Sequence, residues 1–570
     1  MHVLGINYSN DAAACIVRDG HVIAACQEER FRRIKHYSGF PEQAIRWCLG
    51  EAGITMEEVD HVGFFWNPGI HAEAFHGASA SRRHHQEFLF SVPNYLINRF
   101  FDGRSVQHVR QQFTISSSGN TAKTLDLHYC THHLTHAAGT FYRSNFDEAA
   151  ILLVDGYGER ASTTIATGRG TTIETLQTID FPHSVGSLYA AFTQFLGFQA
   201  NNGEGKVMGL ASYGQDSEYV QKIRGLVELT ADGFELDLSY FSYFLERTRR
   251  YQPKLQELMG PERRASDPME QRHYDIAYAL QKTTEDILLH LAHMTKARTG
   301  LSKLCMAGGV VLNCVANARI QREAGFDEVY FMPCSSDAGT SMGAALMVAH
   351  DQGAERVEHP MTDYLGPQFT NDEIAACLDR GGVSATRLAD LDATANAAAD
   401  AIADGQIIGW FQGRAEFGPR SLGNRSILCD PARADMKEVL NARVKFREPF
   451  RPFAPSILEE AAGTYFADGG KASPFMLLVY DTLPEHVASL PAVTHVDGGA
   501  RVQTVSREQN ERYYTLIKAV GERTGVPCVV NTSFNIRGEP IVNSPEDALR
   551  CFFTNDMDKL FLGDFLIAKG

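Results

Sequence analysis

Two histidines separated by three residues are the first side chains in this sequence whose types and spacing suit chemistry. They lie in a run that reads Cys-Thr-His-His-Leu-Thr-His over residues 130–136. On a helix, His132 and His136 project from the same face one turn apart, as two imidazoles must to share a metal ion. A pair of surface or N-cap histidines is the alternative for this spacing taken alone. His133 points elsewhere on such a helix and is a weaker candidate.

Two acidic loops would complete a metal site. Asp155 ends a hydrophobic strand-like run and precedes Gly156, and Asp337 lies two residues before Gly339. Carboxylates beside glycines at strand ends are natural ligands, because the backbone can approach closely there. Two imidazoles with one or two carboxylates, and with coordination positions left open, favour Fe(II) or Mn(II) over a closed structural zinc.

Two glycine-containing loops are candidates for binding a nucleotide. Gly308 and Gly309 follow a strand-like run and open a helix, which exposes backbone N–H groups to an anion. A tight turn is the alternative for such a pair. Lys206 lies between glycines in the stretch 203–211, which again suits a phosphate. Neither loop is a Walker A motif, so the P-loop class is not supported.

A basic segment stands out in the last third of the chain. Residues 414–451 contain nine basic and five acidic side chains, although the whole chain carries a net charge of −16. Arg414, Arg420, Arg425 and Arg451 flank glycine or proline turns, which could place forked guanidinium groups around one anion. Solvated arginines that bridge surface carboxylates are the alternative. That alternative is stronger for individual members of the segment, namely Arg433, Lys437, Arg443 and Arg447.

The elements that must position these groups form a repeated pattern. A strand, a polar loop and a strand–turn–strand hairpin are predicted over 2–26, and the same order recurs over 149–176. Two such units, each followed by helical sequence, predict a duplicated α/β fold with two lobes. A chance likeness between two β-meanders is the alternative.

The remaining organisation is simpler. An amphipathic helix is predicted over 274–298 with Gly300 as its stop, and the stretch 355–367 is the best linker candidate. The irregular stretch 68–130 is expected to form an inserted cap, and the charged stretch 240–275 has helical tendency. A second α/β unit should follow the linker, with strands near 406–412, 474–480, 527–531 and 559–568.

Composition excludes several classes of protein. With 570 residues and 44% hydrophobic residues, the chain can fill large cores and is not mostly disordered. Its net charge of −16 disfavours nucleic acids and anionic membranes as partners. The 11 cysteines include no Cys-x-x-Cys pair, and neither a signal peptide nor an apolar stretch near ~20 residues is visible. We therefore expect a cytoplasmic protein.

Taken together, these motifs resemble a known family. The His132-x-x-x-His136 pair and the loops at 154–156, 307–313 and 336–339 resemble the universal tRNA threonylcarbamoyl-transfer ATPases of the actin/Hsp70-like superfamily. The motifs over 413–425, 451–455 and 531–540 are more specific. With the first set they resemble O-carbamoyltransferases of the NodU/CmcH type, which act on nodulation factors, cephalosporins, aminoglycosides and other natural products. The resemblance covers essentially the whole chain in the same domain order.

The resemblance implies a fold and a two-step reaction. It implies an α/β fold with a duplicated actin/Hsp70-like domain over 1–358 for carbamoyl transfer, and a YrdC-like α/β domain over 359–570. Carbamoyl phosphate and ATP would react in the second domain to give carbamoyladenylate and pyrophosphate. In the first domain, a bound Fe(II) or another divalent metal would help to transfer the carbamoyl group to a hydroxyl of a small-molecule acceptor. Mg²⁺ would accompany the ATP.

The resemblance also assigns residues. The implied metal ligands are His132, His136, Asp155 and Asp337, with His136 counted as catalytic. The implied adenylate contacts are Lys206, Gly308, Gly309 and Asn313, with Asp155 and Gly156 in the adjoining loop and Lys35 nearby. The implied ligands of carbamoyl phosphate and the ATP phosphates are Arg420, Lys445, Arg451, Arg501 and Arg537. Asp11, at the mouth of the first loop, is the candidate base for the acceptor alcohol.

Two other functions remain open at this point. A carbamoyltransferase of the hydrogenase-maturation type would carry Cys-x-x-Cys zinc modules, and this sequence has no such pair. A nucleotide-binding regulator of the actin-like superfamily would explain the N-terminal lobes, but it would leave the arginine-rich C-terminal unit without a purpose. Release of AMP and pyrophosphate that depends on carbamoyl phosphate would distinguish the transferase from the regulator.

Overall fold

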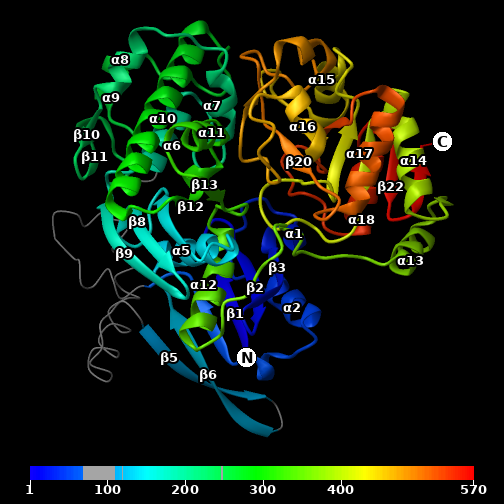
Figure 1. Ribbon diagram of the computed structural model, residues 1–570, viewed down its shortest axis with the longest axis horizontal. Coiled ribbons are helices and arrows are strands. Elements are labelled where there is room, and N and C mark those ends of the chain that lie inside the picture. Colours follow the sequence, from blue (N-terminus) through cyan, green and yellow to red (C-terminus); the bar gives the residue numbers. More distant parts are fainter. Residues whose placement is uncertain (68–108, 118–119, 246–247, 570) are drawn as a thin grey trace. The chain divides into compact units, whose positions relative to one another are not determined.

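The computed structural model describes residues 1–67, 109–117, 120–245 and 248–569. These residues form two compact units (Figure 1). The N-terminal unit consists of 1–25 and 38–359, and the C-terminal unit consists of 26–37 and 360–570. The structural boundary at 359/360 therefore lies beside the predicted one, whereas the segment 26–37 belongs to the C-terminal unit. Most of the predicted cap over 68–130 lies outside the described residues.

The first sheet of the N-terminal unit has the order β3-β2-β1-β4-β6-β5. The central strand β1 is antiparallel to β2 and parallel to β4, and β4 is parallel to β6. The edge strand β5 pairs with β6 as an antiparallel hairpin. The strands are β1 (His2–Asn7), β2 (Ala13–Arg18), β3 (His21–Gln27), β4 (His61–Phe64), β5 (Val109–Ser117) and β6 (Asn120–Tyr129).

The second sheet repeats this arrangement in the order β13-β12-β7-β8-β9. Its central strand β7 is antiparallel to β8 and parallel to β12, and β12 is parallel to β13. The strands are β7 (Glu148–Val154), β8 (Ala161–Arg169), β9 (Thr172–Asp180), β12 (Lys303–Ala307) and β13 (Glu328–Phe331). Apart from the additional edge strand β5, the two sheets share one strand order, so the predicted duplicated α/β fold is confirmed.

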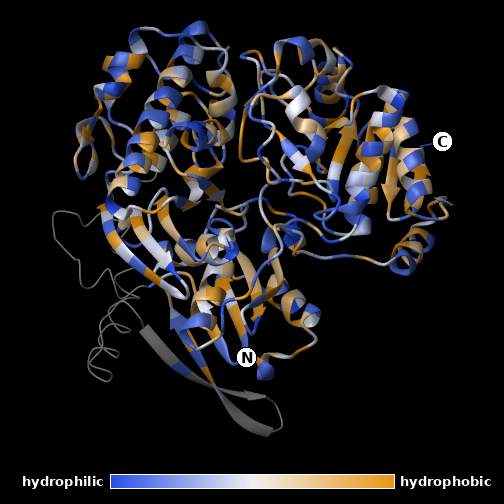
Figure 2. Ribbon diagram, in the orientation of Figure 1, coloured by the Kyte–Doolittle hydropathy of each residue, from blue (hydrophilic) through white to orange (hydrophobic). Residues whose placement is uncertain are grey.

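Helices cover the central strands, which explains their continuous hydrophobic sequence. Helix α12 (Ala338–Asp351) packs on β1, β2 and β4, while α5 (His132–Arg143) packs on β7 and β12. Helix α10 (Gln271–Thr299) also contacts β7, whose residues 149–154 are completely buried. A strand covered on both faces has no solvated side, so it does not alternate polar and apolar residues. Hydrophobic residues accordingly follow α12 and the inner strands in Figure 2.

Helices α5 and α12 approach each other very closely. An ideal Cβ at Gly343 of α12 would lie 1.7 Å from the carbonyl oxygen of Thr135 in α5. A Cβ at Gly5 of β1 would lie 1.8 Å from the carbonyl oxygen of Ser341 on α12. Glycine at these positions therefore lets α12 pack tightly against both β1 and α5, next to the predicted ligands at the start of both helices.

The predicted helix over 274–298 is confirmed as α10, which ends at Gly300 in the left-handed conformation (φ 66°). The charged stretch 240–275 is only partly helical, because α9 (Pro253–Met259) is its one α-helix ahead of α10 among the described residues. The other elements of this unit are α2 (Glu42–Glu51), α6 (Val185–Phe195), α7 (Glu204–Ala211), α8 (Glu218–Arg224), β10 (Val227–Thr230), β11 (Gly233–Leu236) and α11 (Cys314–Glu323).

The C-terminal unit is built on a mixed sheet of order β14-β23-β22-β15-β16-β21-β17-β20. Strand β15 is parallel to β22 and antiparallel to β16, and β21 lies antiparallel between β16 and β17. The strands are β14 (Thr386–Arg387), β15 (Ile408–Phe411), β16 (Arg425–Cys429), β17 (Ala454–Leu458), β20 (Gln503–Val505), β21 (Cys528–Ser533), β22 (Lys559–Leu562) and β23 (Phe565–Ala568).

Helices α14 and α17 pack against this sheet around a core that includes Trp410, Leu516 and Phe561. The helices of the unit are α1 (Glu28–Arg32), α13 (Asn371–Gly381), α14 (Leu391–Ala403), α15 (Met436–Leu440), α16 (Glu459–Tyr465), α17 (Glu511–Thr524) and α18 (Pro545–Phe553). The unit is mixed α/β, as predicted, and its likeness to YrdC stays a prediction.

One predicted strand of this unit is wrong. Residues 474–479 form no strand, and only β18 (Tyr480–Asp481) pairs, with β19 (Gly499–Ala500). Pro474 has no N–H to donate, and the backbone of Met476 is left-handed (φ 56°). The side chains of Phe475 and Leu477 are nevertheless buried, which explains the hydrophobic pattern. Among the described residues, no helix is long and apolar enough to cross a bilayer.

Candidate functional site

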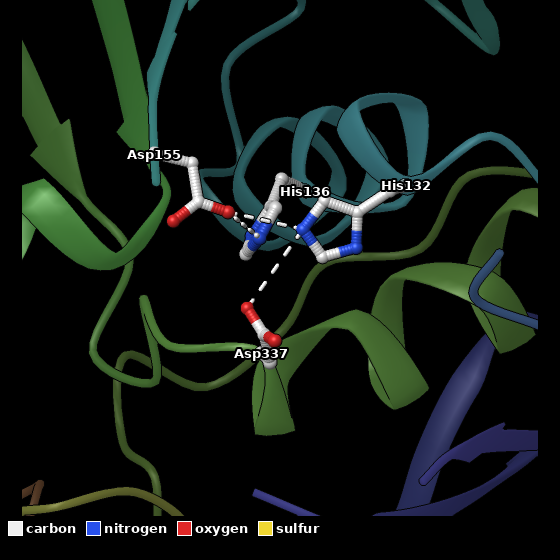
Figure 3. A group of neighbouring side chains, drawn as sticks. All are labelled: His132, His136, Asp155 and Asp337. Carbon is white, nitrogen blue, oxygen red and sulfur yellow. Dashed lines mark hydrogen bonds and ion pairs between the residues drawn. The ribbon is translucent and has the colours of Figure 1, made fainter. Parts of the chain in front are cut away.

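Four of the predicted ligands meet in the N-terminal unit (Figure 3). His132 Nε2 lies 3.0 Å from Asp155 Oδ2 and 3.7 Å from Asp337 Oδ1, while His136 Nε2 lies 3.5 Å from Asp155 Oδ2. One ligand atom from each of the four residues lies within 4.8 Å of the others. Both imidazoles are buried, and Asp337 is the most exposed of the four, so the group is open on the side of Asp337.

The start of α5, which carries His132 and, one turn later, His136, is held by a buried acid. The carboxylate of Glu159 accepts hydrogen bonds from the backbone N–H of His132 at 2.9 Å and of Asn67 at 2.6 Å. The helix begins at His132, whose N–H has no partner within the helix, so Glu159 supplies the missing acceptor. Burial raises the pKa of Glu159. We did not predict Glu159 from the sequence, although it directly follows the Asp155–Gly158 loop.

Asp155 is oriented by backbone groups. Its Oδ1 accepts hydrogen bonds from the N–H of Gly156 at 2.7 Å and of Gly309 at 3.1 Å, which leaves Oδ2 toward the imidazoles. Gly308 has φ 100°, and an ideal Cβ there would lie 2.3 Å from the carbonyl oxygen of Val154. The glycine pair after β12 therefore brings the ends of β12 and β7 together and positions the carboxylate.

Asp337 precedes α12 and is anchored by the loop after β1. Ser9 Oγ donates a hydrogen bond to Asp337 Oδ2 at 2.7 Å, and Asn7 Nδ2 donates to the backbone oxygen of Asp337. Asn7 Nδ2 also lies 3.3 Å from the backbone oxygen of Asp11. The loop that carries Asp11 is thus next to the four-residue group, and the role of Asp11 as a base stays a prediction.

The four side chains of the group shift one another's pKa values. Burial disfavours the protonated form of His132, yet the carboxylates of Asp155 and Asp337 outweigh it and raise its pKa to about 9. The imidazoles hold the pKa of Asp155 well below its usual range against the effect of burial, whereas burial raises that of Asp337. His136 Nε2 is buried without a hydrogen-bond partner. His132 Nδ1 is likewise buried without a hydrogen-bond partner. Two imidazoles and two carboxylates, with His136 Nε2 facing Asp155 Oδ2, fit a bound divalent metal.

His133 differs from its neighbours, as predicted. Its Nδ1 lies 2.7 Å from Thr164 Oγ1 on β8. Burial lowers the pKa of His133 to about 3, so the imidazole is neutral at physiological pH. His133 therefore packs α5 against the second sheet and faces away from the four-residue group.

The predicted adenylate contacts have other partners in this structure. Asn313 Oδ1 caps α11 by accepting from the N–H of Ala316 at 3.1 Å, and Asn313 Nδ2 donates to Gln281 Oε1 at 2.9 Å. Lys206 lies on α7 with its Nζ 5.6 Å from the centre of the Phe198 ring. Gly308 and Gly309 support Asp155, as described above. Contact of these four residues with a nucleotide stays a prediction.

The C-terminal unit contains a group of cations that repel one another, which we call the cation cluster: Lys35, Lys445, Arg447, Arg451, Arg501 and Arg537. Burial and the charges of Arg447, Arg451 and Lys35 lower the pKa of Lys445 to about 7. Burial, with the charges of Arg451 and Arg501, lowers the pKa of Arg447 to about 8. Burial, with the charges of Arg501 and Arg537, lowers the pKa of Arg451, against which Glu448 acts as an opposing charge.

The backbone around the cluster holds these side chains in place. A π-helical turn over Asn441–Lys445 follows α15, and Lys445 Nζ donates to Asn535 Oδ1 at 2.9 Å and to the backbone oxygen of Ser533. Arg537, in the loop after β21, donates to the backbone oxygen of Phe446 at 2.8 Å. The segments around 445 and 535 are therefore joined, and both contribute cations.

The individual cations of the basic segment have different surroundings. Arg447 lies within the cluster, although the sequence favoured a surface role for it. Arg433 and Arg443 do pair with acids, at 2.9 Å from Asp435 and 2.8 Å from Asp558. Lys35 belongs to the C-terminal unit, where its charge acts on Lys445. Arg420 is half-buried in the loop between β15 and β16, and its place in the cluster stays a prediction.

Arg425 has a structural role. It is fully buried, its guanidinium donates to the backbone oxygens of Gln412 and Pro367 at 2.6 and 2.8 Å, and it stacks 3.6 Å from the centre of the Phe411 ring. An arginine that is enclosed by backbone oxygens in this way organises the β15–β16 connection and cannot reach an anion outside it.

Replacing Glu159 with Gln tests how α5 is held. Glu159 Oε1 accepts from the N–H of both Asn67 and His132, and Oε2 also accepts from that of His132. A glutamine would bring an NH₂ group toward the N–H of His132 and remove the charge that faces the helix end. We expect the affinity of the full chain for Fe(II) or Mn(II) to fall about 10-fold to 100-fold, measured by metal titration. Glu148→Gln is the matched control, because Glu148 is exposed and pairs with Arg169. Equal affinities in both variants would contradict the role of Glu159.

Comparison with known proteins defines the class. The family models described as carbamoyltransferase N-terminus and carbamoyltransferase C-terminus match residues 2–346 and 399–569. The chain therefore belongs to the carbamoyltransferase family that includes the nodulation proteins NolO and NodU, and it is an enzyme of that class.

Individual relatives cover nearly all of the chain. Protein sll1178 of Synechocystis, which is uncharacterised, is 42% identical over 100% of this chain and 97% of its own length. Nodulation protein NolNO of Sinorhizobium fredii is 38% identical over 99% of this chain and 79% of its own length. The crystal structure of full-length HypF in its phosphate- and nucleotide-bound form covers 62% of this chain and 56% of its own, with 14% identity and a TM-score of 0.31.

Proposed function

We propose that the protein is an ATP-dependent O-carbamoyltransferase that divides its reaction between the two units. The observation that carries this proposal is the cation cluster of the C-terminal unit, where burial and neighbouring positive charges lower the pKa values of Lys445, Arg447 and Arg451. Such mutual repulsion costs folding free energy, and polyanionic substrates would relieve it. Carbamoyl phosphate and ATP are the polyanions that a carbamoyltransferase of this family would bring together there.

The first half-reaction would form carbamoyladenylate. Carbamoyl phosphate, water and ATP would give carbamoyladenylate, phosphate and pyrophosphate, with Mg²⁺ accompanying the ATP. Water would first break the bond between the carbamoyl group and phosphate, which gives carbamate and phosphate. A carbamate oxygen would then form a bond to the α-phosphorus of ATP, and the bond from that phosphorus to pyrophosphate would break. Lys445, Arg451, Arg501 and Arg537 would bind the phosphoryl oxygens and stabilise the charge that develops on pyrophosphate. Arg447, which also lies in the cation cluster, and Arg420 would bind phosphoryl oxygens as well.

The second half-reaction would transfer the carbamoyl group in the N-terminal unit. The acceptor hydroxyl attacks the carbamoyl carbon, the bond to AMP breaks, and the hydroxyl proton passes to a base, for which Asp11 is the candidate. His132, His136, Asp155 and Asp337 would hold the divalent metal, which we propose to be Fe(II). A bound divalent metal supplies Lewis-acid polarisation of a carbonyl oxygen. Lys206, Gly308, Gly309, Asn313 and Gly156 would contact the adenylate.

The acceptor is proposed to be a small molecule that carries a sugar hydroxyl. The family includes nodulation proteins, and aromatic rings lie beside the metal ligands. The Trp66 ring is 5.5 Å from that of His132 and 6.3 Å from that of Tyr157, and both aromatic residues are partly exposed. Flat aromatic faces suit the apolar face of a sugar ring. All 11 cysteines are free thiols, which agrees with the proposed cytoplasmic location.

The products formed from ATP test the function. Full-length protein loaded with Fe(II) is incubated with ATP, Mg²⁺, radiolabelled carbamoyl phosphate and a panel of sugar alcohols. We expect pyrophosphate and AMP in equal amounts, with label in one acceptor. Release of ADP without a need for carbamoyl phosphate would instead favour a nucleotide-binding regulator and would contradict the proposal.

Binding of carbamoyl phosphate should depend on pH through Lys445. Its lowered pKa of about 7 means that it is a cation below pH 7 and loses its charge as the pH rises above that value. We therefore expect the KM for carbamoyl phosphate to rise above pH 7, by at most about tenfold per pH unit for one proton. In Lys445→Arg, which keeps its charge, the rise should be much smaller. The same profile in both enzymes would contradict this assignment.

A further inference from the structure

A second cluster of metal-binding side chains lies on β4 and β6, apart from the four-residue group. His61 of β4 and Asp126 of β6 are register partners, and Gly63 pairs with His128. Side chains two residues apart on a strand share a face, so His61, Asp126 and His128 lie on the same face of the first sheet. His128 is 1% exposed, and the side chains of His61 and Asp126 are 15% and 12% exposed. Solvent can therefore reach the cluster from one side.

We propose that His61, Asp126 and His128 form a Zn²⁺ site. His61 Nδ1 lies 3.2 Å from His128 Nε2 and 3.7 Å from Asp126 Oδ2, and the three ligand atoms lie within 4.8 Å of one another. A tetrahedral zinc with bonds of about 2.0–2.1 Å has ligand atoms about 3.3–3.4 Å apart. The observed separations are close to that value, so little movement is needed to bind the ion. The fourth position would be open to water.

The surroundings of Asp126 support this geometry. Gln112 Nε2 on β5 donates a hydrogen bond to Asp126 Oδ1 at 3.0 Å, which leaves Oδ2 toward His61. A ligand carboxylate is commonly oriented by such a hydrogen bond to its other oxygen. The donor set of two imidazoles and one carboxylate suits zinc, whereas the second carboxylate of the four-residue group suits Fe(II) or Mn(II).

The position of the site indicates what zinc would do. His61 and His128 are 67 residues apart in the chain, so the ion would cross-link β4 to β6 and close a long loop. His128 also lies only four residues before His132, where α5 begins. The zinc would therefore fix β6 just ahead of the helix that carries His132 and His136. This inference does not depend on the proposed carbamoyltransferase mechanism.

Metal counting tests the proposal with Zn²⁺ itself as the probe. Full-length protein is freed of metal with a chelator and dialysed against Zn²⁺, and bound zinc is measured by mass spectrometry. We expect two equivalents in the wild type, one in His136→Ala, and one in His61→Gln. The double variant should bind none. His293→Gln is the matched control, because His293 Nε2 contacts the backbone oxygen of Glu323 on the surface, and it should keep two.

Cobalt identifies the geometry of the site. Co²⁺ bound to His136→Ala should show the intense visible absorption of a tetrahedral complex, and this band should disappear when His61→Gln is added. Asp126→Asn is the milder variant, since asparagine can still accept from Gln112. It should weaken Zn²⁺ binding at this site at least about 10-fold. Equal amounts of bound zinc in the wild type and in His61→Gln would overturn the proposal and leave only a hydrogen bond between the two imidazoles.

Discussion

Replacing His136 with alanine is expected to abolish carbamoyl transfer while the C-terminal half-reaction continues. His136 Nε2 is buried, has no hydrogen-bond partner and lies 3.5 Å from Asp155 Oδ2, and its proposed role is to bind the metal. Losing the Lewis acid should cost several kcal/mol of transition-state stabilisation, or at least about 10³-fold in rate. ATP–pyrophosphate exchange that depends on carbamoyl phosphate should persist, because its cations belong to the C-terminal unit.

The measurement is a pair of assays on the same folded protein. Label transfer to the acceptor reports the N-terminal unit, and pyrophosphate exchange reports the C-terminal unit. His133→Gln is the matched control, since His133 neighbours the ligands but contacts Thr164 on β8. It should retain both activities. If His136→Ala loses both activities and still unfolds cooperatively, the division of the half-reactions between the units is wrong.

Replacing Arg451 with alanine is expected to raise the KM for carbamoyl phosphate strongly. A charge-assisted hydrogen bond to a phosphoryl oxygen contributes about 1.5–3 kcal/mol, which corresponds to a change in KM of roughly 10-fold to 150-fold. Without substrate, Arg451→Ala should not destabilise the folded protein, because Arg451 forms no close ion pair with the described residues that the substitution would remove. Arg451 is repelled by Arg501 and Arg537, and its contact with Glu448 is long, at 4.0 Å.

Steady-state kinetics and thermal unfolding together test this assignment. Arg443→Ala is the control, because Arg443 pairs with Asp558 at 2.8 Å and lies outside the cation cluster. We expect Arg443→Ala to lower the melting temperature slightly and to leave the KM unchanged. Arg451→Ala should raise the KM and should not lower the melting temperature. An unchanged KM in Arg451→Ala would remove Arg451 from the substrate site.

Much of the N-terminal unit was predictable from local patterns. The strand–turn–strand order over 2–26 and 149–176 was visible because turn residues separate short apolar runs, and such signals are local. The i,i+4 spacing of His132 and His136 placed them on one helix face for the same reason. The family was predictable too, since its motifs are short and contiguous.

Longer-range features were harder to predict. The burial of Phe475 and Leu477 imitates a strand, but Pro474 and the left-handed Met476 prevent pairing. Arg447 looked like a surface residue, because nothing near it in the sequence shows that the segments around 501 and 537 pack beside it. Glu159 caps α5 from a loop 27 residues away in the chain.

The sequence by itself determined which side chains could act and on which elements they lie: two histidines on one helix, acids at strand ends, and a basic segment in an acidic chain. Only the tertiary structure decided which of them meet. Gly5 and Gly343 permit α12 to pack closely on β1 and α5. Asp337, just before α12, lies 3.7 Å from His132 at the start of α5. Such proximity depends on how the surfaces of distant segments pack against each other. Residue spacing along the chain does not predict it, because spacing describes only neighbours in sequence.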